Sequence, residues 1–81
     1  MDRVMAFGQV VRRARLLKGF TQEDLAEKAS LHRNFVSLVE RGQSNIALDS
    51  LFVLADALET TASELLRDAE MVAQKNSGDS N

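Results

Sequence analysis

Residues 21–42 (TQEDLAEKASLHRNFVSLVERG) constrain the fold of this chain most, because they predict two short helices joined by a tight turn. Thr21 and Asp24 form the pattern of a capping box, in which side-chain oxygens accept hydrogen bonds from the free amides of a helix's first turn. Apolar side chains recur at helical spacing on one face of each helix: Leu25, Ala26 and Ala29 in the first, and Phe35, Val36 and Val39 in the second. The second helix therefore keeps a polar outer face.

Four side chains lie on that outer face, namely Arg33, Asn34, Ser37 and Leu38. Arginine can pair in a bidentate way with guanine and asparagine with adenine, each contributing about 1–3 kcal/mol of discrimination between bases. Ser37 suits a base edge or a phosphate, and Leu38 suits a thymine methyl group. The alternative is an ordinary solvated helix surface with one exposed leucine. Because such a short helix suits the major groove of DNA, we expect all four residues to contact bases.

Helical periodicity predicts five helices, which cover residues 4–18, 22–29, 33–41, 48–58 and 62–70. The chain has no proline, tryptophan or tyrosine and is rich in alanine and leucine, which favours an all-α, compact five-helix bundle. Residues 1–73 suffice for a single domain with one core. The polar residues 74–81 (QKNSGDSN) are expected to form a disordered tail.

The composition excludes several classes of protein. With no cysteine and one histidine, a zinc finger, a disulfide framework and a histidine-based catalytic site have almost nothing to be built from. No apolar run approaches a membrane span, and the N-terminus lacks a signal-peptide core. We also find no nucleophile–base pair and no phosphate-cradling glycine loop. We therefore expect a cytoplasmic, non-enzymatic protein with no metal, no cofactor, no membrane contact and no small-molecule ligand.

Five sequence blocks occur in a familiar order: VVRRARLLKG, FTQEDLAEKA, FVSLVERG, SNIALDSLFVLADAL and TTASELL. Together they resemble the helix-turn-helix regulators of the XRE, or lambdoid phage repressor (Cro-like), family. The VERG–SNIAL junction is similar to that of the small controller proteins of restriction–modification systems. The resemblance covers roughly residues 5–68. It implies a lambda repressor-like DNA-binding domain that regulates transcription.

The resemblance also implies how DNA is bound. Regulators of this family bind pseudo-palindromic operators as homodimers, with the third helix of each subunit in successive major grooves. A glutamine at the start of the second helix bonds a phosphate in this family, and Gln22 matches that position. The helix N-terminus favours a phosphate there as well. Further phosphate contacts are expected from Arg12, His32, Gln43, Ser44 and Asn45.

Two other positions match a structural feature of the family. An arginine of the first helix commonly pairs with the glutamate near the end of the third, and Arg15 and Glu40 occupy these positions. The chain departs from the pattern at Ser30 and Glu59, where glycine is common, and at Ala47, where a capping Ser or Thr is usual. A left-handed backbone would cost serine about 1 kcal/mol, which the fold can tolerate.

The net charge of −2 hides an uneven distribution. Residues 1–42 carry eight basic and five acidic side chains, whereas residues 43–81 carry two basic and seven acidic ones. A basic half that includes the third helix is the asymmetry expected of a DNA-binding domain.

Surplus apolar residues late in the chain suggest a homodimer interface, for which we single out Val53, Leu66, Met71 and Val72. The alternative is that they pack around the edge of the core. A second possible function is that of a protein-interaction module with the same fold, either antitoxin-like or antirepressor-binding. Exposed Leu38 and Val53 would serve such a module equally well.

Overall fold

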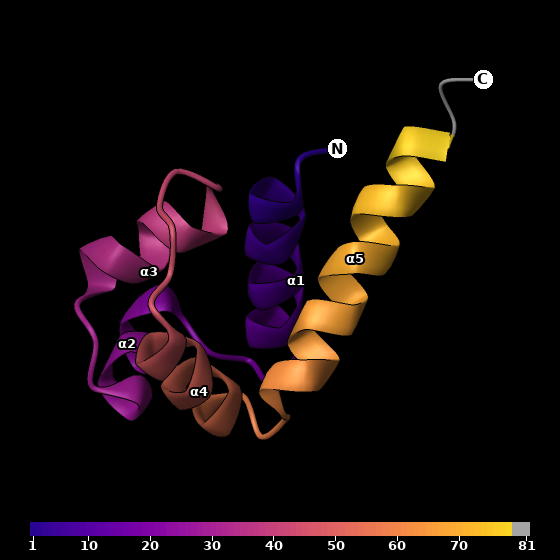
Figure 1. The fold of residues 1–81 in the computed structure, drawn as a ribbon. Helices are drawn as coiled ribbons and strands as arrows, with labels where there is room; N and C mark the ends of the chain where they lie inside the picture. The colour runs from indigo at the N-terminus through magenta and orange to yellow at the C-terminus, as the bar shows by residue number, and fades with distance from the viewer. Residues whose placement is uncertain (79–81) are drawn as a thin grey trace.

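The computed structural model describes residues 1–78, which form five helices and no strand (Figure 1). Their bounds are α1 Arg3–Leu17, α2 Gln22–Ala29, α3 Arg33–Glu40, α4 Leu48–Ala57 and α5 Ala62–Gly78. The predicted all-α fold class is confirmed. Within this part of the chain, no helix has the length and apolarity that crossing a membrane requires.

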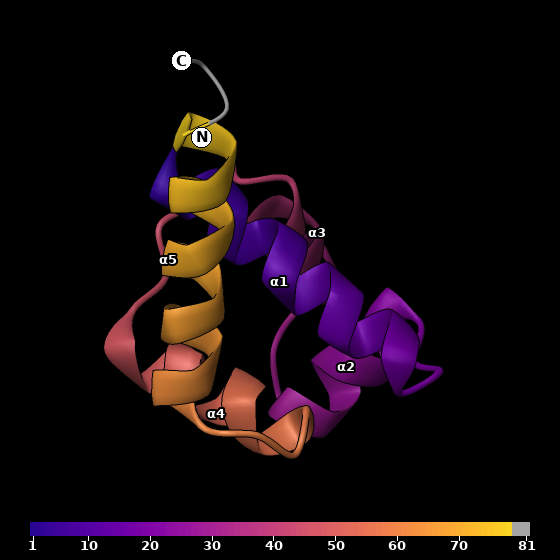
Figure 2. The same cartoon turned by 90° about the vertical axis from the view of Figure 1, so that its right-hand side faces the viewer.

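Helix α1 lies at the centre of the arrangement, between α3 on one side and α5 on the other (Figure 1). Helix α2 packs on α3 and α4, and α4 also contacts α5. Helices α1 and α5 cross at an angle and diverge toward the C-terminal end of α1 (Figure 2). The largest fully buried side chains come from four helices, and they are Val11, Leu25, Val36, Val39 and Leu54. One core therefore holds both helices of the predicted helix-turn-helix.

The capping box at the start of α2 is confirmed in both directions. The Asp24 carboxylate accepts a hydrogen bond from the Thr21 N–H at 2.9 Å, and Thr21 Oγ1 accepts one from the Asp24 N–H at 3.0 Å. The backbone hydrogen bond from Thr21 holds the pKa of Asp24 below its ordinary value. At the start of α5, Thr61 Oγ1 accepts a hydrogen bond from the Glu64 N–H at 3.1 Å and so caps the first turn of that helix.

Two turns require a left-handed backbone from residues other than glycine. Ser30 ends α2 at φ 57° and Glu59 follows α4 at φ 58°, the two positions where the sequence lacks the usual glycine. Each side chain strains the backbone by about 1 kcal/mol. The Glu59 carboxylate forms a solvent-exposed ion pair with Lys18 at the end of α1. That ion pair also holds the pKa of Glu59 below its ordinary value.

The predicted end of the last helix is wrong. Helix α5 continues from residue 70 to Gly78, so residues 74–78 are helical and do not form a disordered tail. Leu65, Ala69 and Ala73, spaced four apart, are buried along one face of α5, which explains why the helix continues beyond residue 70 as far as residue 73. The remaining residues of the predicted tail, 79–81, lie outside the described part of the chain.

Candidate nucleic-acid interface

Helix α3 has one buried face and one exposed end. Val36 and Val39 are buried in the core, while Arg33 and Asn34 in the first turn are exposed. Since the buried valines fix the orientation of this short helix, the two polar side chains project from a rigid support. His32 precedes them, exposed and with no side-chain bond that caps the helix. Three polar side chains thus lie together at the N-terminal end of α3.

Ser37 and Leu38 are less accessible than the first turn. Both side chains are half-buried, so Leu38 is not the fully exposed residue that the helical pattern predicts. The turn after α3 folds back here, because the Gln43 N–H donates a hydrogen bond to the Leu38 carbonyl at 2.9 Å. The accessible part of the outer face is therefore its N-terminal end.

The predicted ion pair between α1 and α3 is present. Arg15 Nε lies 2.6 Å from Glu40 Oε2, and Arg15 Nη2 donates to Glu40 Oε1 at 3.0 Å. Arg15 Nη1 donates to the Phe20 carbonyl at 2.8 Å. Both charged residues are only 7 % exposed. The hydrogen bond to Glu40 raises the pKa of Arg15 above its ordinary value, so the guanidinium stays charged.

Gln22 joins the same network from the start of α2. Its Nε2 donates a hydrogen bond to Glu40 Oε1 at 3.1 Å, and the side chain is half-buried. A side-chain amide has two N–H donors, so the second hydrogen of Nε2 can serve another acceptor. Residue Glu40 thus links α1, α2 and α3 and fixes the orientation of the Gln22 amide.

A glycine that sequence reasoning missed also sets the position of α3. A Cβ at Gly8 of α1 would lie 2.7 Å from the Glu40 carbonyl oxygen, and closer still to that of Val39. Only glycine lets α1 approach the end of α3 this closely. In the sequence, the only sign of this contact is a glycine inside a helical pattern, where it costs about 1 kcal/mol relative to alanine.

The other predicted phosphate contacts occupy two elements. Arg12 is an exposed residue of α1. Gln43, Ser44 and Asn45 lie in the loop between α3 and α4, with Gln43 and Asn45 exposed and Ser44 half-buried. Ser44 Oγ donates to the Asn45 carbonyl at 3.1 Å, so a phosphate contact from Ser44 requires its hydroxyl to rotate away from that bond. Gln22 begins α2 and this loop follows α3, so they lie at opposite ends of the helix-turn-helix segment in the sequence.

The structure separates the four residues predicted for a dimer interface. Val53, Leu66 and Met71 are exposed, whereas Val72 is partly buried against the core. Leu66 lines a groove with the start of α1 and the loop after α3. Met71 and Val72 line a different groove, between the second half of α1 and α5. Sequence reasoning missed two other exposed apolar residues of α4, Leu48 and Phe52.

No group of three or more potential metal ligands occurs among residues 1–78.

Comparison with known proteins gives the class to which this arrangement belongs. A family model described as "Helix-turn-helix" matches residues 11–65. The chain is 39 % identical over 66 residues to "Control protein C.SmaI" of Serratia marcescens, covering 82 % of this chain and 79 % of that protein. It is 41 % identical over 63 residues to "Control protein C.BamHI" of Bacillus amyloliquefaciens, covering 76 % and 78 %.

A solved structure agrees with these relatives. The restriction-modification controller protein C.AhdI from Aeromonas hydrophila superposes with a TM-score of 0.75 and 44 % identity, covering 76 % of this chain and 94 % of that one. The proteins that match are regulators rather than enzymes. The chain therefore belongs to the XRE-type helix-turn-helix family of DNA-binding transcription regulators, and it is similar to the control proteins of restriction–modification systems.

Proposed function

We propose that this protein binds a specific pseudo-palindromic operator in double-stranded DNA as a homodimer and thereby regulates transcription. The observation that carries this proposal is the exposed N-terminal end of α3, where Arg33 and Asn34 project from a helix whose other face is buried. These two side chains are the base-reading residues, pairing with guanine and adenine respectively. Ser37 and Leu38 contact bases at the margin of the same surface, since each is half-buried.

Phosphate contacts hold this helix in register. Gln22 uses the second hydrogen of Nε2 for a backbone phosphate, while Glu40 accepts the first. The position of Gln22 at the start of α2 adds the free amides and the positive dipole end of that helix. Arg12, His32 and the loop residues Gln43, Ser44 and Asn45 supply the remaining contacts. These contacts strengthen binding to every sequence and carry no base specificity.

One short helix contacts too few base pairs to identify an operator, so a dimer is needed to read two half-sites. Two-fold dimers of this class place their recognition helices about 34 Å apart, in successive major grooves. We assign the dimer contact to α4 and the start of α5, where Val53, Leu66 and also Phe52 are exposed. Met71 and Val72 lie in a separate groove and contribute less to this contact. A protein of constant monomeric mass at micromolar concentrations would contradict the dimer.

Capture of genomic DNA tests the proposal. Fragmented DNA from the host is incubated with the purified protein at near-physiological salt, and the retained fragments are sequenced. We expect an enriched palindrome with half-sites about one helical turn apart. Arg33→Ala should weaken the enrichment and remove the base preference at one position in each half-site, whereas Arg67→Ala, which removes an exposed arginine of α5, should leave the enriched motif unchanged. Weak, salt-sensitive retention with no enriched motif would favour a protein-interaction module instead.

A further inference from the structure

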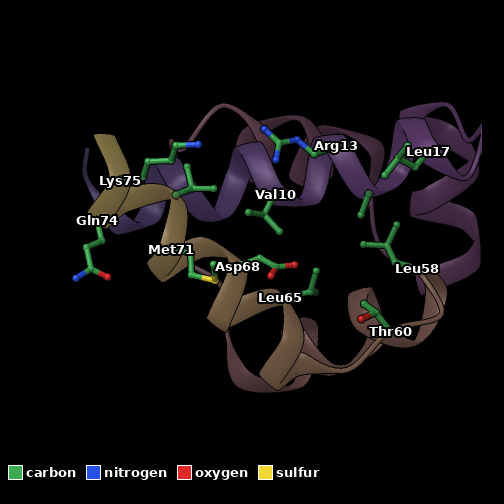
Figure 3. Close-up of a pocket in the computed structure, with 12 residues that line it drawn as sticks. Val10, Arg13, Leu17, Leu58, Thr60, Leu65, Asp68, Met71, Gln74 and Lys75 are labelled. Carbon is green, nitrogen blue, oxygen red and sulfur yellow. The ribbon is translucent and has the colours of Figure 1, made fainter. Parts of the chain in front are cut away.

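A groove of about 640 Å³ runs between α1 and α5 (Figure 3). Helix α5 lies on the side of α1 that faces away from α3 (Figure 1). Seven apolar side chains line it: Val10, Ala14, Leu17, Leu58, Leu65, Met71 and Val72. Leu17 is 83 % exposed and Met71 is 56 % exposed, so much of this apolar surface faces solvent. A continuous exposed apolar surface with polar edges marks an interaction site more often than single exposed side chains do.

The groove has the dimensions of a helix-binding surface. Helix α5 lines it from Leu65 to Lys75, a length of about 15 Å at 1.5 Å per residue. A docked helix of ten residues would have the same length, or nearly three turns. The groove is also open to solvent along its face. Sites for small molecules enclose most of their ligand, so an open trough between two helices suits a third helix better.

Charge at the edge of the groove indicates what kind of helix fits. Arg13 from α1 and Lys75 from α5 reach the same edge in Figure 3, and Asp68 lies on the α5 side. Within residues 1–78 neither cation forms an ion pair. Two unpaired cations against one carboxylate favour an acidic occupant. A second copy of α5 fits less well, because its own face toward the groove carries one carboxylate, Asp68, and one cation, Lys75, and so has no excess of negative charge.

We propose that this groove docks an amphipathic helix of a partner protein. The partner helix places an apolar stripe on Leu17 and Met71, and carboxylates along one flank pair with Arg13 and Lys75. Because α1 separates the groove from α3, the partner can bind while α3 occupies DNA. The regulator would then recruit a second protein to its operator, which is a function beyond operator binding itself.

Selection from a display library of helical peptides tests the proposal. The library consists of 14-residue helices with leucine fixed on one stripe and randomised flanking positions, selected against the full chain. We expect enriched peptides to carry Asp or Glu along one flank. An enriched peptide should bind R13E/K75E at least tenfold more weakly than the wild-type chain. R67E makes the same kind of charge change on α5 outside the groove, so it should leave binding nearly unchanged.

Three results of the peptide experiments would overturn the proposal: no enrichment, enrichment of neutral or basic flanks, or equal weakening by R67E and R13E/K75E. Circular dichroism of each variant checks the fold, which these exposed positions should leave intact. Sedimentation of L17D identifies the rival occupant. Leu17 lies outside the core, so loss of self-association in L17D would show that a second copy fills the groove and would exclude a partner helix.

Operator binding is measured separately, by retention of genomic DNA. Failure of that assay with intact peptide binding contradicts the regulatory proposal alone. Failure of the peptide selection with intact operator binding contradicts the docking groove alone.

Discussion

At the scale of single residues, Glu40 controls how the recognition helix is held. One carboxylate accepts hydrogen bonds from Arg15 of α1 and Gln22 of α2, and it belongs to α3 itself. A buried charge of this kind is tolerated only while its partner is present, because water cannot replace the lost hydrogen bonds. The network therefore joins the stability of the fold to the position of the side chains that we propose to face DNA.

Removal of the Arg15 side chain should destabilise the protein strongly. Arg15→Ala leaves the Glu40 carboxylate buried without its cation, which should lower the free energy of unfolding by about 3–5 kcal/mol. Urea unfolding measures the change, and a clear fall in melting temperature should accompany it. Arg12→Ala, an exposed neighbour on the same helix, should change the free energy by about 0.5 kcal/mol or less. Equal stability of both variants would show that the pair contributes little.

Addition of one methyl group at Gly8 should also destabilise the fold. The new Cβ of Gly8→Ala would overlap the carbonyl oxygens of Val39 and Glu40, so α1 and α3 must move apart. Overpacking of this kind costs about 1–3 kcal/mol. The exposed neighbour Gln9→Ala supplies the control, since alanine is at least as good a helix former. A stabilised Gly8→Ala would contradict the close approach.

At the scale of elements, the helices follow from the sequence to the extent that local signals determine them. The spacing of Leu25, Ala26 and Ala29 and the Thr21 cap are local, and α2 has the predicted bounds. The end of α5 was missed because Ala69 and Ala73 are held by contact with the rest of the fold, while the composition of residues 74–78 is polar. Gly8 and the partial burial of Leu38 depend likewise on contacts between distant segments, which periodicity does not report.

The caps of α2 and the turn after α4 should make stability depend on acid. Hydrogen bonds from Thr21 and Lys18 hold the pKa values of Asp24 and Glu59 below the ordinary 3.8 and 4.5. A carboxyl whose pKa is depressed by folding contributes stability that is present above its unfolded pKa and lost as the pH falls through its folded pKa. The protein should therefore lose stability below about pH 4.5.

Asp24→Asn isolates the contribution of the α2 cap. The variant cannot ionise at this position, so its melting temperature should fall less between pH 6 and pH 3 than that of the wild-type chain. Asp56→Asn removes an exposed carboxylate of α4 outside the caps and should preserve the wild-type pH dependence. Identical pH profiles for Asp24→Asn and the wild-type chain would contradict this assignment.

At the scale of the whole molecule, α1 lies between the two surfaces to which we assign functions. The proposed DNA-facing side consists of the start of α3, Gln22 and the loop after α3, and the groove between α1 and α5 lies on the side of α1 away from α3 (Figure 1). The first 42 residues carry the excess of basic side chains, although the whole chain has a net charge of −2. Distribution of charge, rather than its sum, therefore suits the molecule to DNA.

Binding to the operator should weaken steeply as salt is added. Each phosphate that a lysine or arginine side chain neutralises releases condensed counterions, so the logarithm of the affinity falls linearly with the logarithm of salt concentration. Arg12→Ala removes one cationic phosphate contact per subunit and should lower this slope by about 1 per half-site, whereas Gln22→Ala removes a neutral contact and should leave the slope nearly unchanged. Fluorescence anisotropy of a labelled operator between about 50 and 200 mM salt measures the slope. An affinity that does not change with salt concentration would contradict the phosphate contacts.

The most direct test measures the affinities of the wild-type chain, Arg33→Ala and Gln22→Ala for a panel of single-base operator variants. It tests the claim that α3 reads bases while α2 contacts the phosphate backbone of the DNA. Arg33→Ala should lose about 1–3 kcal/mol on the intact operator and become indifferent to the base at one position in each half-site. Gln22→Ala should bind every operator variant more weakly by the same factor. If both variants lower the affinity uniformly across the panel, Arg33 does not read a base and the division of roles between α3 and α2 is wrong.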